Sequence, residues 1–191
     1  MKLLSKKVTP LIIGVCGRSC SGKSTVVMEL EERYTDVLHI TQDKFFKIKA
    51  DNWESPESLR NDRLIYSIKK LKNGEPTHIP SHRWTEVFDR KIKPHKMIIV
   101  EGYLLFVDDE LADLFDMKIW VDISDFNMLY RRTKRDGNVN GMDYTVNVVI
   151  PKSHKYEKIQ KSRADIIIDG NKSKEEIIEE IEEHMRKWHD I

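Results

Sequence analysis

Residues 17–24 read Gly17-Arg18-Ser19-Cys20-Ser21-Gly22-Lys23-Ser24 and match the pattern G-x-x-x-x-G-K-[ST]. The apolar run 11–15 precedes this segment, and a helical pattern begins at its last residue. A strand, a glycine-rich loop and a helix in this order are the context in which the pattern forms a phosphate-binding loop. The glycines allow successive backbone N–H groups to point inward, and the helix N-terminus favours negative charge.

This loop predicts a binding site for a nucleoside triphosphate, ATP or GTP. We expect Lys23 to reach the β- and γ-phosphates and Ser24 to supply an oxygen ligand for Mg²⁺. The alternative is a glycine-rich turn between a strand and a helix that binds no ligand. The residues expected to contact the nucleotide are Gly17, Ser19, Ser21, Gly22, Lys23, Ser24 and Thr25.

Short apolar runs alternate with helical patterns along the chain. Such runs are typical of parallel strands that are covered on both faces. The alternation predicts an α/β fold of the P-loop NTPase type, with a doubly wound, parallel, five-stranded sheet flanked by helices. At 191 residues the chain is expected to form one domain, 1–191. Strands are predicted at 11–15, 37–40, 97–100, 118–121 and 164–168, and helices at 24–34, 58–73, 125–135 and from 173 onward.

The charge balance and the apolar runs bear on partners and location. The 33 basic and 32 acidic side chains nearly cancel and are interspersed, which argues against binding to nucleic acid. The run 11–15 is too short for a signal peptide, and no run approaches the roughly 20 residues of a membrane-spanning helix. We therefore expect a cytoplasmic protein without a nucleic-acid or membrane partner. Whether the chain forms a homo-oligomer stays open.

Two carboxylates follow predicted strands, on the same rim of the sheet as the glycine-rich loop. Asp43 follows the run 37–40, and Glu101 follows the run 97–100. In phosphoryl transfer, one carboxylate can steer a magnesium-bound water while the other accepts a hydroxyl proton. Either could instead be a loop acid or a helix cap. Ser24, Asp43 and Glu101 are the candidate metal-binding residues, and Asp43 is also the candidate base.

An arginine-rich helix end, Tyr130-Arg131-Arg132-Thr133-Lys134-Arg135-Asp136, runs into the glycine and asparagine stretch 137–141. This segment has the features of a flexible lid at about 131–145, because arginines can cover the charge on a transferring phosphoryl group and a mobile cover excludes water. The alternative is a solvated basic helix face. On the lid hypothesis, Arg132 and Arg135 join Lys23 as candidate catalytic residues.

Because it contains these motifs in this order, the chain resembles the uridine kinase family, together with its relatives the nicotinamide riboside kinases and the phosphoribulokinases. The resemblance covers most of the chain. Residues 42–46, Gln-Asp-Lys-Phe-Phe, match Q-D-x-F-[YF], and residues 52–57, Asn-Trp-Glu-Ser-Pro-Glu, match N-[FW]-D-x-P-[DE]. Further matches are Ile99-Val100-Glu101-Gly102 with Leu105-Phe106, Arg131-Arg132 with Arg135-Asp136, and the run 164–168.

The resemblance implies transfer of the γ-phosphoryl group of ATP or GTP to the 5′-hydroxyl of a ribonucleoside. It implies that Asp43 deprotonates this hydroxyl and that Glu54, where the family usually has Asp, holds the ribose hydroxyls. Phe46 would then line the acceptor pocket. Arg132 and Arg135 correspond to lid arginines near the sugar and the phosphates.

The acceptor stays open, because the segment 80–90 departs from the family pattern P-x-Y-D followed by H-x-R. His82 or Trp84 could stack on a base, or could simply pack within this loop. A uridine kinase-like nucleoside kinase is the leading hypothesis. A kinase of nicotinamide riboside or of another small hydroxylated metabolite is the alternative, since the segment 169–173 resembles the nicotinamide riboside branch. A nucleotide-dependent switch or binding protein is the alternative from another class.

Overall fold

The predicted strands form one parallel sheet. The structure, a computed structural model, describes residues 9–50, 52–137 and 140–189. All neighbouring strands of the sheet are parallel, in the order β2-β5-β1-β6-β7. The predicted α/β fold with a five-stranded sheet is confirmed. Its strands are β1 (Leu11–Gly17), β2 (Val37–Thr41), β5 (Met97–Gly102), β6 (Met117–Asp122) and β7 (Ile166–Asp169).

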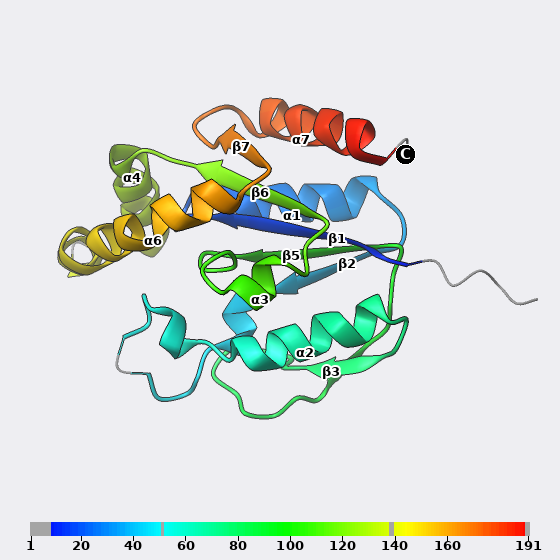
Figure 1. Cartoon of the computed structure of the whole chain (residues 1–191). Helices are drawn as coiled ribbons and strands as arrows, with labels where there is room; N and C mark the ends of the chain where they lie inside the picture. The colour runs from blue at the N-terminus through cyan, green and yellow to red at the C-terminus, as the bar shows by residue number, and fades with distance from the viewer. Residues whose placement is uncertain (1–8, 51, 138–139, 190–191) are drawn as a thin grey trace, which may run out of the picture.

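Helices cover both faces of this sheet, with α1 (Lys23–Arg33) and α7 (Lys174–His189) on one side and α2 (Asn61–Lys72) and α3 (Asp109–Ala112) on the other (Figure 1). Successive side chains of a strand point to opposite faces. Ile13 therefore packs in the cluster formed with α1 and α7, whereas the adjacent Ile12 packs in the cluster formed with α2. Burial on both sides explains why the strands read as continuous apolar runs.

The remaining elements begin beyond the carboxyl ends of the strands, and the last of them runs back along β6 to the start of β7 (Figure 1). They are α4 (Asp125–Asp136), α5 (Asn140–Tyr144), a π-helical segment (Thr145–Val149) and α6 (Ile150–Arg163). Together these elements connect β6 to β7. The expected lid, 131–145, thus falls on the end of α4, on α5 and on the first residue of the π-helical segment, and residues 138 and 139 of its glycine and asparagine stretch lie outside the described residues.

An antiparallel hairpin of β3 (Thr77–Ile79) and β4 (Arg90–Ile92) lies apart from the main sheet. Two short 3-10 segments, Gln42–Phe45 and Pro56–Ser58, precede α2. The predicted helix 58–73 therefore begins later, at Asn61, and the last strand begins at Ile166 rather than at residue 164. The hairpin and α3 are too short to produce a clear periodic pattern.

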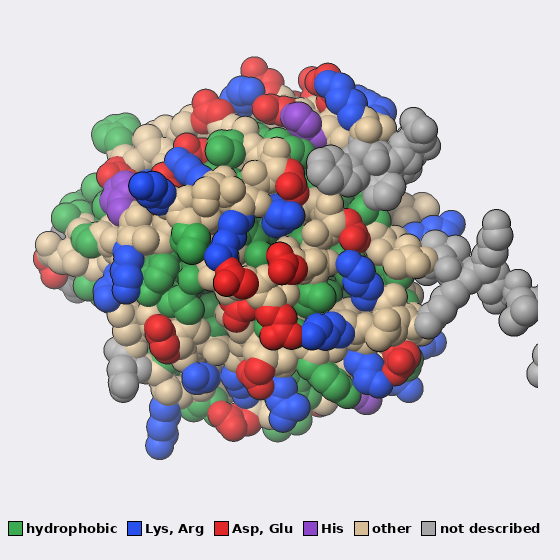
Figure 2. Space-filling view, viewed as in Figure 1, with side chains coloured by type: hydrophobic (Ala, Val, Ile, Leu, Met, Phe, Trp, Pro, Cys, Tyr) green, Lys and Arg blue, Asp and Glu red, His purple; other side chains and the backbone are tan. Residues whose placement is uncertain are grey.

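Helix α6 is a further element that hydrophobic periodicity did not predict. Its sequence is largely polar, and its buried residue is Gln160, whose side chain is only 2% exposed. A helix that contacts the core through a polar side chain has no apolar stripe to detect. Among the described residues, no helix has the length and apolar character needed to span a membrane. Basic and acidic side chains are interspersed over the face drawn in Figure 2.

Candidate active site

The glycine-rich loop joins β1 to α1 at the carboxyl edge of the sheet. Gly22 has φ 99°, in the left-handed region that favours glycine. Gly17 is required for a different reason, because a Cβ atom there would lie 2.5 Å from the carbonyl oxygen of Val121 and 2.7 Å from Ser21 Oγ. Gly22 therefore sets the backbone turn into α1, and Gly17 allows the loop to pack closely on β6.

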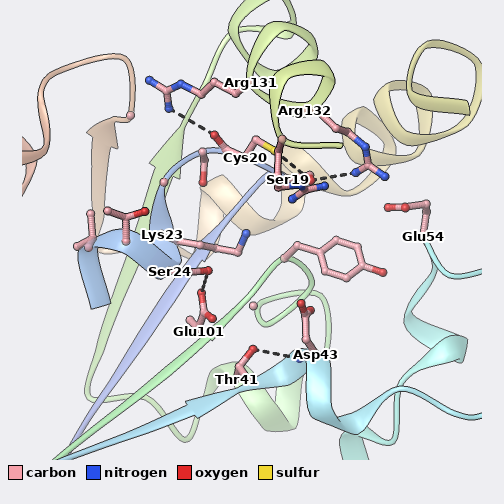
Figure 3. Close-up of a pocket in the computed structure, with 18 of the residues that line it drawn as sticks. Ser19, Cys20, Lys23, Ser24, Thr41, Asp43, Glu54, Glu101, Arg131 and Arg132 are labelled. Atoms are coloured by element: carbon pink, nitrogen blue, oxygen red, sulfur yellow. Dashed lines mark hydrogen bonds between the residues drawn. The ribbon is translucent and has the colours of Figure 1, made fainter. Parts of the chain in front are cut away.

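Ser24 and Glu101 meet at the start of α1 (Figure 3), where Ser24 Oγ donates a hydrogen bond of 2.6 Å to Glu101 Oε2. Burial acts to raise the pKa of Glu101, which is only 6% exposed. The His39 imidazole, whose Nε2 lies 3.5 Å from Glu101 Oε1, the charge of Lys23 and the Ser24 hydroxyl together outweigh burial and hold this pKa below its ordinary value. Glu101 is therefore a charged carboxylate beside a hydroxyl group.

This oxygen pair is suited to a magnesium ion. Hydroxyl and carboxylate oxygens are the hard ligands that Mg²⁺ prefers, and the ion usually takes its other ligands from water and substrate phosphates. Within the ranges that the structure describes, no three His, Cys, Asp or Glu side chains form a metal site by themselves. Ser24 and Glu101 thus fit an ion that is shared with a bound nucleotide.

Asp43 lies in the 3-10 segment after β2, and its side chain faces the same cavity (Figure 3). The preceding residue, Gln42, is fully buried and anchors this turn. Its Oε1 accepts a hydrogen bond of 3.1 Å from the backbone N–H of Leu104. Gly102 makes room for that amide, since a Cβ atom at Gly102 would lie 2.4 Å from Gln42 Oε1. Gln42 therefore couples the turn that carries Asp43 to the end of β5.

Arginines from α4 point at the glycine-rich loop (Figure 3). Arg131 Nη1 donates to the Cys20 carbonyl oxygen at 3.3 Å, and Arg132 Nη1 donates to Ser19 Oγ at 2.9 Å. Arg135 lines the same cavity. Because α4 is a continuous helix through this stretch, it carries these arginines on a regular element next to the expected phosphate position.

Arg18, at a variable position of the loop motif, turns away from the cavity. It is 4% exposed and donates hydrogen bonds to Ser153 Oγ at 3.0 Å and to the Ile123 carbonyl oxygen at 3.2 Å. Its guanidinium also forms an ion pair with Asp125. Arg18 therefore ties the loop to the start of α4 and to α6, a structural role that the motif alone does not reveal.

One cavity of about 890 Å³ brings most of the predicted site residues together. Gly17 and His82 do not line it. His82 is exposed, and its Nδ1 lies 2.9 Å from Ser81 Oγ on the same loop. The predicted residues that do line the cavity are Ser19, Ser21, Gly22, Lys23, Ser24, Thr25, Asp43, Phe46, Glu54, Trp84, Glu101, Arg132 and Arg135.

Aromatic rings gather near Asp43 at what we call the aromatic end of the cavity, defined by Phe46, Trp53, Glu54, Trp84 and Tyr144. Trp84 stacks on Phe46, with ring centroids 5.5 Å apart and an angle of 22° between the planes. Trp53 meets Trp84 edge to face at 4.2 Å. These rings form a wall suited to a flat, partly apolar ligand.

Glu54 is the acidic group of the aromatic end. Tyr144 Oη donates to Glu54 Oε1 at 3.5 Å. Burial raises the pKa of Glu54, and the nearby charge of Arg132 and the Tyr144 hydrogen bond offset this effect only in part. The carboxyl group is thus held in a partly dry environment, in which hydrogen bonds to a ligand are stronger than in water.

Several lining residues were not among the predicted site residues. Trp53 and Arg131 lie inside motifs that were recognised, and Tyr103 follows Glu101-Gly102, so adjacency to those motifs was a usable signal. Arg83 and Tyr144 reach the cavity from the hairpin loop and from α5; they lie in the divergent segment 80–90 and in the expected lid 131–145, but the sequence singled out neither side chain. These two residues illustrate contacts that only the tertiary structure reveals.

The segment 169–174 borders the opposite end of the cavity, where Lys172 and Lys174 line it. The Gly170 N–H donates to the Asp122 carbonyl oxygen at 2.7 Å, and a Cβ atom at Gly170 would lie 2.7 Å from the Ser21 carbonyl oxygen. This segment therefore packs against the glycine-rich loop. The segment whose sequence suggested the nicotinamide riboside alternative thus lies beside the glycine-rich loop, away from the aromatic end.

Comparisons with known proteins extend the resemblance. Residues 32–175 match the model of the Phosphoribulokinase / Uridine kinase family, a range that includes Asp43, Glu54 and Glu101. A uridine kinase of Chlamydia pneumoniae is 34% identical, with 84% of this chain and 82% of that protein covered. A uridine kinase of Streptococcus pneumoniae (strain Hungary19A-6) is 35% identical, with 83% and 85% covered. A solved shikimate kinase of Acinetobacter baumannii has the same fold, with a TM-score of 0.58, 12% identity, and 94% of this chain and 93% of that chain covered.

Proposed function

Because the chain belongs to the phosphoribulokinase/uridine kinase family, we propose that it is a nucleoside kinase that transfers the γ-phosphoryl group of ATP, or GTP, to the 5′-hydroxyl of a ribonucleoside. The observation that carries this proposal is the juxtaposition of Asp43 with the Ser24–Glu101 pair on one cavity. Strands β2 and β5 are neighbours, and Thr41 is opposite Glu101, so Asp43 follows two residues later on the same rim. A base beside a triphosphate site is what transfer to a hydroxyl requires.

In the proposed step, Asp43 accepts the proton of the acceptor hydroxyl while the hydroxyl oxygen bonds to the γ-phosphorus. The bond between that phosphorus and the β–γ bridging oxygen breaks, and the bridging oxygen leaves with the nucleoside diphosphate. Asp43 then releases its proton to water. Lys23, Arg132 and Arg135 supply positive charge toward the phosphate oxygens, which bear the charge of a loose transition state.

Ser24 and Glu101 are the residues that would hold Mg²⁺ in this reaction. When bound there, the ion would neutralise phosphate charge and orient the transferring group. Glu54 can accept hydrogen bonds from both vicinal hydroxyls of a ribose, which distinguishes ribose from a deoxy sugar. The rings of the aromatic end provide a surface on which a nucleobase can stack.

A panel assay tests this function. The purified protein is incubated with Mg²⁺, labelled ATP or GTP, and uridine, cytidine, nicotinamide riboside, pantothenate or ribulose phosphate, and the products are resolved. We expect phosphorylation of a pyrimidine ribonucleoside, and faster turnover of uridine than of its 2′-deoxy analogue. If nicotinamide riboside alone is phosphorylated, the acceptor is nicotinamide riboside and not a pyrimidine ribonucleoside. Nucleotide hydrolysis that needs no acceptor and is unaffected by Glu54→Gln would instead indicate a switch protein.

A further inference from the structure

The loop between β3 and β4 brings Arg83 to the cavity, where its guanidinium forms an ion pair with the Asp43 carboxylate. The two residues are 40 positions apart in sequence. Among the described residues, no other side chain donates a hydrogen bond to that carboxylate. Among the described side chains, Arg83 is therefore the one that holds an oxygen of this carboxylate by a hydrogen bond.

The backbone of the loop explains how Arg83 and Trp84 can both line the cavity. Adjacent side chains of an extended chain point in opposite directions. Trp84 has φ 61°, a left-handed conformation that is unfavourable for a non-glycine residue and is maintained only by surrounding contacts. At Trp84 those contacts are the stack on Phe46 and the edge-to-face packing with Trp53.

Arg60 fixes this loop from the other side. Its Nη2 donates to the Phe46 carbonyl oxygen at 2.7 Å and to the Thr85 carbonyl oxygen at 2.6 Å, and its side chain is 13% exposed. The single Arg60 guanidinium thus joins the segment after Asp43 to the residue after Trp84. The position of Arg83 relative to Asp43 is consequently set by buried contacts and not by a surface ion pair alone.

The charges at the aromatic end are paired in the same manner. Burial is the main cause of the raised pKa of Glu54. The negative charge of nearby Asp43 adds to this effect. Arg132 from α4 counters Glu54, and Arg83 from the hairpin loop counters Asp43. Each acid therefore has an arginine partner from a separate element, and Asp43 also interacts electrostatically with Arg135.

We propose that Arg83 is a positioning residue that holds one oxygen of Asp43, so that the other oxygen is left to receive the acceptor proton. The inference rests on the proposed function, because it assigns Arg83 a role through the proposed base. The plain alternative is an ion pair of little consequence, since the Arg83 side chain is 52% exposed and solvent-exposed ion pairs contribute little.

Steady-state kinetics of Arg83→Ala, Arg83→Lys and the double variant with Asp43→Asn test the inference. Misorientation of a catalytic group costs up to about 100-fold, so we expect kcat of Arg83→Ala to fall about 10- to 100-fold while the KM for ATP is unchanged. Lysine should restore activity in part, because it lacks the planar fork of arginine, and added guanidinium should partly rescue the alanine variant. On the Asp43→Asn background, the same change should have almost no further effect.

Arg90→Ala is the matched control, since it removes an exposed arginine of the same hairpin that does not line the cavity. Its kcat should equal that of the wild type. An Arg83→Ala loss confined to the KM of the acceptor, or one of equal size on the Asp43→Asn background, would overturn the positioning role.

A crystallographic comparison separates this inference from the proposed function. We expect one orientation of the Asp43 carboxylate in the wild type and several in Arg83→Ala. A single, unchanged orientation in both would refute the role of Arg83 even if the enzyme phosphorylates a nucleoside. If no nucleoside is phosphorylated, the nucleoside assignment fails, whereas the orientation of Asp43 still decides the structural part of the inference.

Discussion

Ser24 Oγ lies 2.6 Å from a carboxylate oxygen of Glu101, although the two residues are 77 positions apart in sequence. The contact arises because β1 and β5 are parallel neighbours in which Val15 is opposite Glu101. Parallel strands end at the same edge of a sheet, so the loop after β1 and the end of β5 must meet there. The candidate magnesium site is therefore a consequence of strand order.

Glu101→Gln keeps the size of this side chain and removes its charge. We expect the Mg²⁺ concentration for half-maximal activity to rise about 10-fold or more, the usual scale when a group that supports a metal site is lost. A magnesium titration of the kinase rate measures this effect, with the urea unfolding midpoint as the control for folding. An unchanged magnesium dependence would argue against the assignment.

Asp43→Asn should retain nucleotide binding and lose transfer. The amide cannot accept the hydroxyl proton, so kcat should fall about 100-fold or more, the usual scale for loss of a general base. Calorimetric titration with Mg-ATP serves as the control and should give the wild-type dissociation constant. Transfer at the wild-type rate would contradict the role of Asp43 as the base.

Arg18→Ala should destabilise the fold. The change removes hydrogen bonds to Ser153 and to the buried carbonyl oxygen of Ile123, which should lower the free energy of unfolding by about 2 kcal/mol. Urea denaturation measures the loss. Arg135→Ala is the matched comparison, because the Arg135 side chain is 57% exposed and its ion pair with Asp136 should contribute less than about 1 kcal/mol. Equal losses in the two variants would show that Arg18 is not the anchor of the loop.

Gly102→Ala should disturb the turn that carries Asp43. The new Cβ atom would lie 2.4 Å from Gln42 Oε1 and 2.7 Å from Gln42 Cβ, so Gln42 must move and its hydrogen bond with Leu104 is lost. Overpacking of this kind costs roughly 1–3 kcal/mol, and we expect a lower melting temperature together with a lower kcat. Ser67→Ala, a buried change away from the cavity, is the control and should leave kcat unchanged. A stable, fully active Gly102→Ala variant would contradict the proposed coupling.

The acceptor KM should depend on the protonation of Glu54. Because burial raises the pKa of this residue above the ordinary value of 4.5, it takes up a proton at a higher pH than an exposed glutamate does. The KM for the acceptor should therefore rise on acidification while Glu101, whose pKa is lowered, is still charged. A pH series of acceptor KM measures the effect. Glu54→Gln should have a high KM with no such rise, and an identical pH profile in that variant would count against Glu54 as a ligand of the acceptor.

Much of the fold could be predicted because its signals are local. Residues 11–15 are apolar since both faces of β1 are covered, and residues 17–24 carry their function in the backbone of a single loop. Asp43 and Glu101 were identifiable because each follows a recognisable strand. Helix α6 was missed because it presents the polar side chain of Gln160 to the core, where Oε1 accepts from Cys16 Sγ at 3.0 Å.

By itself, the sequence determined the strand–loop–helix unit of the phosphate loop, the alternation that makes a parallel sheet, and the family to which the acidic motifs point. These features depend on residues near one another in the chain. Only the tertiary structure decided that Arg18 is an internal anchor, that Arg83 meets Asp43, and that His82 lies outside the cavity while Trp84 lies within it. The physical reason is that side-chain direction in a loop follows from single backbone dihedrals, such as φ at Trp84, and from distant packing partners that leave no periodic pattern in the sequence.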